Sequence, residues 1–140
     1  MTQENKELLL KDLCGRLPYG VKMNHIADDE HSPKTLIGVA KDMITLEGLG
    51  GYECVDVENY KPYLFPLSSM TEAQQEEFDR IYADDMQVVA NNLKNRLDGK
   101  PYKRNLGHYR HIDWLNANHF DYRCLIPKGL AIDVTGLNIY

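Results

Sequence analysis

Hydrophobic residues recur at helical spacing in two stretches of the 140-residue chain. The first stretch covers about Gln3–Leu17 and ends before Pro18, a residue that stops helices. In the second stretch, apolar side chains step by four, four, three, four and four residues. This pattern predicts an N-terminal amphipathic helix and a second helix that either continues to Leu97 or breaks near Ala83 and Asp84. The stripe of the second helix is Phe78, Tyr82, Met86, Val89, Leu93 and Leu97.

Between these two helices the pattern changes to short apolar runs and alternations separated by Gly, Pro and Asn, which indicates β-strands. A short helix is expected over His111–His119, and a final strand over Leu130–Val134. The whole chain, residues 1–140, is therefore predicted to be a single α+β domain. We expect a small antiparallel sheet of four to five strands, with the N-terminal helix and the helices of the C-terminal half packed on it. The expected strands are Val21–Ile26, Thr35–Val39, Met43–Glu47, Tyr52–Val57 and Tyr63–Leu67.

Local signals fix some expected details of this fold. Ser69 and Glu72 have the spacing of a capping box, so we expect Ser69 to begin the second helix. A turn is expected over Asn59–Pro62, because Asn and Pro favour turns. The predicted core combines the apolar faces of the helices and strands. It consists of Leu9, Leu13, Leu17, Val21, Ile37, Val39, Ile44, Val55, Leu64, Phe78, Tyr82, Val89, Leu93, Trp114, Leu115 and Leu125.

Composition and charge narrow the functional classes. The formal net charge is -5, which disfavours general nucleic-acid binding because phosphate backbones are repelled. Neither an apolar run of membrane-spanning length nor a signal peptide is found, so we expect a cytoplasmic protein without a membrane partner. The three cysteines, Cys14, Cys54 and Cys124, form no CxxC pair and lie in apolar stretches. They are expected to be reduced, buried thiols.

Histidines and aspartates gather between residues 108 and 121, where His108, His111, Asp113 and His119 offer ligands that zinc, manganese or iron accept. Three such ligands and an open position for water would support a metal-dependent hydrolase or nuclease. The spacing matches no metalloenzyme motif, and surface histidines are the more common explanation for such a group. The sequence therefore favours a protein with no cofactor, and the metal site is kept as an alternative.

Cationic and aromatic side chains alternate in the same region of the chain. Such residues hold single-stranded nucleic acid by stacking and charge, or they contact another protein, since tyrosine and arginine are enriched in protein interfaces. The acidic net charge makes nucleic acid the less favoured partner. The candidate binding residues are Tyr102, Lys103, Arg104, Tyr109, Arg110, Trp114, Tyr122 and Arg123.

Three blocks of sequence resemble a family of small proteins from gut bacteria and their phages or mobile elements. These blocks are Glu7–Lys22, Pro66–Thr71, and Asp113–Arg123 with Leu125–Ala131 after it. The family has no assigned function, so the resemblance implies no activity; a phage or mobile-element setting favours a small binding or inhibitor protein.

The absence of catalytic motifs, the acidic charge and the nine tyrosines together favour a non-enzymatic protein. We expect a cytoplasmic binding or regulatory protein that contacts another protein, either of the host or a second copy of itself. The sequence does not determine the oligomeric state. The alternative function is the metal-dependent hydrolase or nuclease that uses His108, His111, Asp113 and His119.

Overall fold

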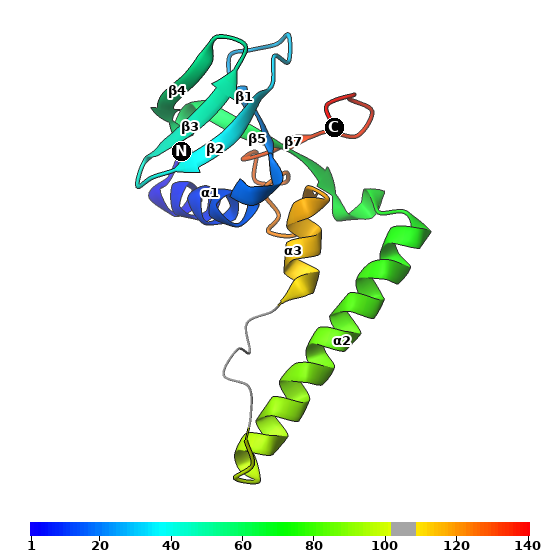
Figure 1. Ribbon diagram of the computed structural model, residues 1–140. Coiled ribbons are helices and arrows are strands. Elements are labelled where there is room, and N and C mark those ends of the chain that lie inside the picture. Colours follow the sequence, from blue (N-terminus) through cyan, green and yellow to red (C-terminus); the bar gives the residue numbers. More distant parts are fainter. Residues whose placement is uncertain (102–108) are drawn as a thin grey trace. The chain divides into compact units, whose positions relative to one another are not determined.

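The computed structural model describes residues 1–101 and 109–140 of the chain, which fold into two compact units (Figure 1). The first unit combines residues 1–69 with residues 116–140, and the second unit is the intervening segment 70–115. The chain combines helices with a mostly antiparallel sheet, so the predicted α+β class is confirmed.

The first unit contains helix α1 and the seven strands that the described residues form. The sheet order is β4-β3-β2-β1-β5-β6, and β7 also pairs with β5. Neighbours from β4 to β5 are antiparallel, whereas β6 and β7 run parallel to β5. The sheet therefore has more strands than the four to five expected. The elements are α1 (Gln3–Arg16), β1 (Lys22–His25), β2 (Lys34–Val39), β3 (Met43–Gly48), β4 (Gly51–Asp56), β5 (Tyr60–Pro66), β6 (Phe120–Asp121) and β7 (Ile132–Asp133).

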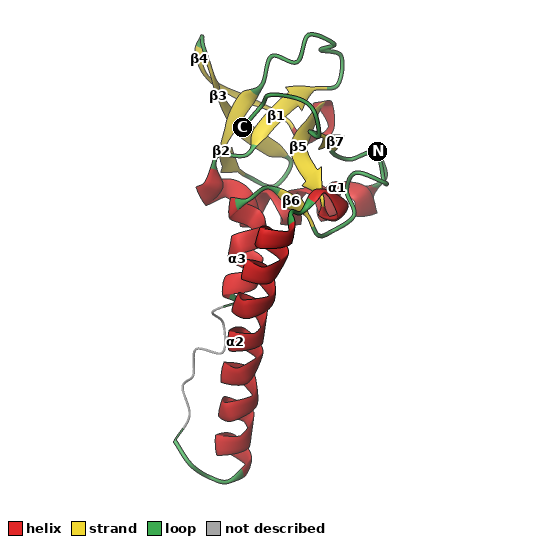
Figure 2. Cartoon of the chain, turned by 90° about the vertical axis from the view of Figure 1, so that its right-hand side faces the viewer, coloured by secondary structure: helices red, strands yellow, loops and turns green. Residues whose placement is uncertain are grey.

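The core of this unit forms between α1 and the sheet (Figures 1 and 2). Thr2 begins α1, because its hydroxyl oxygen accepts a hydrogen bond from the backbone N–H of Asn5 at 3.2 Å. Leu9 and Leu13 then lie on the buried face, both fully enclosed. Each buried leucine contributes roughly 1.5–3 kcal/mol through removal of apolar surface from water. The predicted core residues that are buried are Leu9, Leu13, Val21, Ile44, Leu64, Leu115 and Leu125.

Other predicted core residues lie nearer the surface. Ile37 is 39% exposed because the register of β2 against β3 shifts between Leu36 and Gly38, so the strict alternation of β2 fails there. Gly38 fits this irregularity, since a Cβ at that position would come within 3.1 Å of the Thr45 side chain. Tyr82 and Leu93 are also exposed. The half-buried members of the predicted core are Leu17, Val39, Val55, Phe78, Val89 and Trp114.

The turn expected over Asn59–Pro62 is wrong. A short 3-10 helix (Val57–Asn59) precedes β5, and Pro62 pairs with Met23 inside the strand. Proline is tolerated there because the pairing of β7 with β5 begins one residue later, at Tyr63. Among the described residues, the part of β5 that contains Pro62 therefore pairs with β1 and with no second strand.

The three cysteines are exposed, free thiols, and the expectation that they are buried is wrong. On α1 the neighbouring Leu13 points into the core, which turns Cys14 outward. Cys124 follows β6 in a left-handed backbone conformation (φ 58°) and lies before the buried Leu125. Apolar neighbours in the sequence therefore do not determine which way a single side chain faces.

The second unit is helical and consists of α2 (Glu72–Leu97) and most of α3 (Arg110–Ala117). Helix α2 is continuous, so the break considered near Ala83 is absent. Its N-cap is Thr71 rather than Ser69: the Thr71 hydroxyl accepts from the Gln74 N–H at 3.2 Å, and the Gln74 side chain accepts from the Thr71 N–H at 2.9 Å. The hydroxyl of Ser69 donates instead to the carbonyl of Pro66.

None of the helices in residues 1–101 and 109–140 combines the length and apolar character needed to cross a membrane.

Candidate functional site

Helix α2 is the longest element and carries the most conspicuous exposed apolar surface of the second unit. Its 26 residues extend about 39 Å at 1.5 Å per residue. The segment is rich in good helix formers such as Ala, Glu, Gln and Leu. It ends at Asp98, just before Gly99 adopts φ 69°, a conformation that glycine takes without strain.

Helix α3 is attached to the middle of α2 through Asp85, which is only 4% exposed. Its carboxylate accepts hydrogen bonds from the His111 backbone N–H (2.9 Å) and from Arg110 Nε (3.2 Å), and lies 2.7 Å from His111 Nδ1. Burial favours the neutral acid, but these hydrogen bonds favour the carboxylate more strongly, so the pKa of Asp85 lies below its usual value.

Aromatic rings surround this polar contact. Phe78 lies 5.8 Å from Trp114 and 6.1 Å from the stacked ring of Tyr82, measured between ring centroids. Tyr82 and Tyr109 both meet the His111 imidazole edge-on, at 5.1 Å and 5.7 Å. The imidazole is thereby enclosed between rings and a carboxylate. This arrangement explains a structural role for His111: it holds α3 against α2.

From this attachment toward its C-terminus, α2 presents an apolar strip that begins with Tyr82 itself; we define the strip as Tyr82, Met86, Val89, Leu93 and Leu97. At about 100° per residue, these five positions fall within about 80° of the helix circumference. Tyr82 is 45% exposed, Leu93 56% and Leu97 79%, and Met86 and Val89 are half-buried. The apolar strip therefore offers large hydrophobic side chains to solvent over roughly 23 Å of helix.

The structure divides the predicted binding residues between the two units. Tyr109, Arg110 and Trp114 belong to the second unit, where Arg110 is paired with Asp84 and Asp85. Tyr122 and Arg123 belong to the first unit. The remaining three, Tyr102, Lys103 and Arg104, lie outside the described residues.

The residues considered for a metal site are divided in the same way. His108 lies outside the described residues, and His111 and Asp113 are in α3 of the second unit. His119 lies in the first unit, with its ring stacked on Tyr140 at 3.8 Å. Within the described part of the chain, no three His, Cys, Asp or Glu side chains are grouped as metal ligands. The metal hypothesis stays a prediction, since one of its four ligands is not described.

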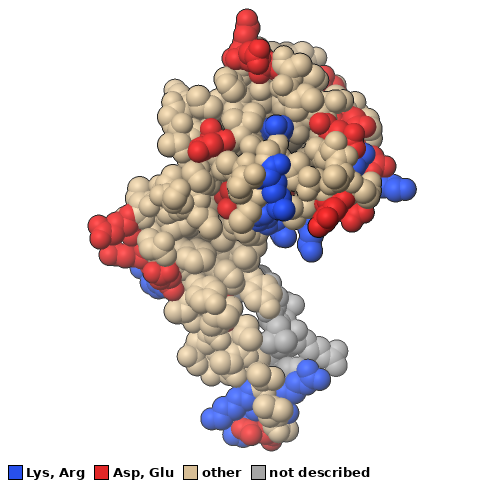
Figure 3. Space-filling model, turned by 180° about the vertical axis from the view of Figure 1, so that it is seen from behind, with Lys and Arg blue, Asp and Glu red and all other residues tan. Residues whose placement is uncertain are grey.

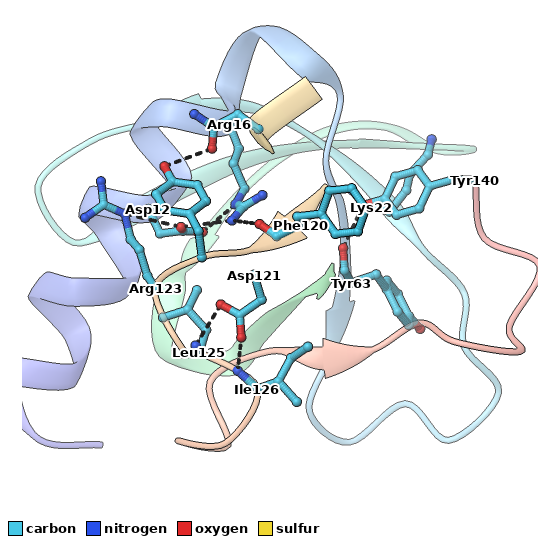
Figure 4. Close-up of polar contacts among 12 residues, drawn as sticks. Asp12, Arg16, Lys22, Tyr63, Phe120, Asp121, Arg123, Leu125, Ile126 and Tyr140 are labelled. Carbon is cyan, nitrogen blue, oxygen red and sulfur yellow. Dashed lines mark hydrogen bonds and ion pairs between the residues drawn. The ribbon is translucent and has the colours of Figure 1, made fainter. Parts of the chain in front are cut away.

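Arg123 takes part in a buried ionic cluster with Asp12 and Arg16 that was not predicted from the sequence (Figure 4), and Tyr122 packs against its two guanidinium groups. Asp12 and Arg16 of α1 are both fully buried, and the Asp12 carboxylate lies 2.6 Å from Arg16 Nε and 3.5 Å from Arg123 Nε. Arg16 also donates to the carbonyl of Phe120 at 2.7 Å. The guanidinium groups of Arg16 and Arg123 lie 5.4 Å and 5.1 Å from the centroid of the Tyr122 ring.

The ionic cluster joins α1 to the C-terminal segment of the same unit. Next to it, Asp121 accepts hydrogen bonds from the backbone N–H groups of Leu125 and Ile126, both at 2.8 Å (Figure 4). The spacing of Asp12 and Arg16, four residues apart on a predicted helix, was a visible signal for their ion pair. Nothing in the sequence indicated that the pair is buried. The cluster satisfies charges inside the fold, so its role is structural.

The first unit also contains a polar pocket of about 230 Å³ beside the loop between β1 and β2. Its lining includes Asn24, His25, Asp28, His31 and Lys61. The Asp28 carboxylate already accepts from the N–H groups of Glu30 and Ser32, and His31 Nδ1 lies 2.6 Å from the Tyr63 hydroxyl. These contacts fix the conformation of the loop that forms one wall of the pocket.

Comparisons of the chain with protein-family models, with curated proteins and with solved structures find no significant match. The functional argument therefore rests on the α+β fold and on the apolar strip of α2.

Proposed function

We propose that this chain is a non-enzymatic binding protein of the cytoplasm that engages another protein through the apolar strip of α2. The single observation that carries the proposal is the exposure of Leu93 (56%) and Leu97 (79%) on the same face of one helix. A helix in a globular protein normally turns its apolar stripe toward a core. Exposed apolar surface arranged along one face is typical of protein interaction sites.

The N-terminal half of α2 supports this role by fixing the helix. Asp85, His111 and the surrounding rings hold α2 and α3 together at the start of the apolar strip. A preformed helical surface loses less conformational freedom on binding than a disordered segment, which favours affinity. Recognition would then follow the helix-in-groove or helix-to-helix mode, with anchors three and four residues apart.

The expected family of small proteins from gut bacteria and phages agrees with a binding role and adds no other support. Because Arg110 is paired with Asp84 and Asp85, nucleic acid is not favoured as the partner by the described residues.

The proposal is tested by placing a photoreactive amino acid at position 97 in cells that express the full chain. Val88 provides a matched control position, because it is an apolar residue of the same helix with a similar exposed fraction of 50%. At about 100° per residue it lies about 140° around the helix from the centre of the apolar strip. We expect a covalent adduct with a polypeptide from position 97 and little or none from position 88.

Equal adduct yields at positions 97 and 88, or no adduct at either, would refute the proposed function. The mass of the adduct identifies the partner: twice the mass of this chain indicates a second copy, and any other mass indicates a different protein.

A further inference from the structure

The geometry points to a second copy of this chain as the partner, with the two α2 helices packed antiparallel along their apolar strips; this inference rests on the proposed function. Such a dimer has two-fold symmetry, so each subunit contributes the same surface. Within the strip, Tyr82, Met86, Val89 and Leu93 step by four, three and four residues, which is the spacing of residues at a helix-to-helix seam.

The apolar strip together with Phe78, which precedes it on the same face of α2, is symmetric about a point between Gln87 and Val88. When a second copy is aligned antiparallel about that point, Tyr82 lies opposite Leu93 of the partner subunit, and Met86 lies opposite Val89 of the partner subunit. Each large side chain at one end of the strip then meets a large side chain of the other subunit. The most exposed residues, Leu93 and Leu97, become buried in this arrangement.

The distribution of charge along α2 favours antiparallel packing of the two helices. The N-terminal part of α2, residues 72–85, contains six acidic side chains and one arginine, whereas residues 86–97 contain two basic side chains and no acidic one. Figure 3 shows acidic side chains over the N-terminal part of α2 and basic side chains at its C-terminal end. Antiparallel packing places each acidic part near a basic part. Parallel packing would place like charges side by side along the whole seam, which disfavours association.

One ionic pair follows from this alignment and makes it testable. Symmetry about the same point places Asp79 opposite Arg96 of the partner subunit, and Arg96 opposite Asp79 of the partner subunit. In a parallel dimer, Asp79 would instead face Asp79 of the partner subunit, and Arg96 would face Arg96 of the partner subunit. The pair therefore distinguishes the two directions.

Sedimentation equilibrium of the purified full chain tests self-association without other proteins present. Concentrations from about 1 μM to about 1 mM cover the range in which an interface of a few apolar side chains per subunit dissociates. We expect a reversible monomer–dimer equilibrium. Leu93→Glu should raise the dissociation constant about 10- to 100-fold, since each dimer contains two copies of the residue. The control Val88→Glu should leave it within about threefold.

Charge-reversal variants test whether the two α2 helices pack antiparallel. Arg96→Glu should weaken the dimer because it places two carboxylates together, and the double variant Asp79→Arg/Arg96→Glu should restore the wild-type dissociation constant. A double variant that stays as weak as Arg96→Glu would overturn the antiparallel arrangement. Circular dichroism at 222 nm checks that each variant keeps its helices.

A purified chain that remains monomeric over the whole concentration range would overturn self-pairing, and so would equal effects of Leu93→Glu and Val88→Glu. Neither result would decide the proposed function, because an adduct from position 97 with a different protein would still support it. Absence of any adduct together with a monomeric chain would overturn both.

Discussion

Removal of the Asp12 carboxylate should destabilise the first unit more than any exposed charge change. Asp12 and Arg16 have no exposed side-chain surface, and Asp12 is the acidic partner of both Arg16 and Arg123. Among the described residues, Asp12→Ala leaves the buried Arg16 guanidinium with the Phe120 carbonyl as its hydrogen-bond acceptor. Breaking a buried ion pair by removing one partner costs about 3–5 kcal/mol, because a charge stays buried without compensation. A domain of ordinary stability has about 5–15 kcal/mol in total.

The measurement is urea unfolding combined with amide hydrogen exchange of β5, whose Tyr63 and Leu64 are fully buried in this unit. Asp84→Ala is the matched control, since its pair with Arg110 at 3.6 Å involves side chains that are 65% and 56% exposed. Exposed pairs contribute about 0–1 kcal/mol.

A double variant distinguishes the destabilisation caused by the unpaired buried charge from the destabilisation caused by the lost contact. Asp12→Leu/Arg16→Met removes both charges and should recover most of the stability, because apolar residues of similar size often replace buried ion pairs without loss. Arg123 is 28% exposed and can turn toward water. A cost below about 1 kcal/mol for Asp12→Ala, or a double variant no better than the single one, would refute this reasoning.

Three further outcomes are expected. Asp85→Ala should loosen α3 from α2 at a cost of about 1–3 kcal/mol, seen as an altered Trp114 fluorescence. Because the pKa of Asp85 is lowered in the folded state, its contribution to stability is present above the unfolded-state pKa and is lost as pH falls through the folded-state pKa. A Trp114 signal that does not change with pH in the acid range would contradict this. Burial, then Arg16 and Lys22, lower the pKa of His119 to about 4, so the unfolded state takes up the proton first and stability falls between about pH 6.5 and pH 4. His119→Asn, which suits the left-handed backbone there (φ 60°), should flatten that part of the stability profile, and an imidazole that titrates near 6.5 in NMR spectra would disprove this. The Tyr140 hydroxyl accepts a hydrogen bond from the Lys22 N–H and donates one to the backbone carbonyl of Tyr63, and burial raises its pKa to about 12. Tyr140→Phe should cost about 1 kcal/mol and remove a phenol that ionises with a pKa of about 12 in an absorbance titration, and an unchanged titration would count against the contact.

Periodicity predicted the helices well because α1 and α2 are long and each repeats its apolar residues at helical spacing. It predicted the position of α2 but not its environment. Four residues of the stripe, Phe78, Tyr82, Val89 and Leu93, were expected in the core, yet Tyr82 and Leu93 are exposed. An apolar stripe shows only that a face avoids water, and it looks the same whether the face is covered by the chain itself or by a partner.

Most strands of the first unit were located from their apolar pattern, but β6 was not, and neither were the pairings over long sequence separation. Strand β6 joins β5 through Phe65 and Phe120, which are far apart in the chain. The same limit applies to the ionic cluster, because Asp12 and Arg16 are local neighbours whereas Arg123 reaches them only through the fold. A single sequence does not show such long-range contacts.

The candidate binding residues were chosen because cations and aromatics are close together in the sequence. The structure assigns Tyr109 and Arg110 to the second unit and Tyr122 and Arg123 to the first, since the boundary between the two units falls within α3. The exposed residues of α2 now carry the binding proposal, and their signal in the sequence was the same stripe that predicted the helix.

The central claim, that another protein covers the apolar strip, is tested most directly by carbene labelling of exposed side chains. The yield at Leu93 and Leu97 is compared with the yield at Val88, in dilute purified protein and in cells that express the chain. We expect the ratio of strip labelling to Val88 labelling to fall severalfold in cells, because a bound partner excludes the reagent from the strip. An unchanged ratio would contradict the proposed function and leave the strip as solvent-exposed surface.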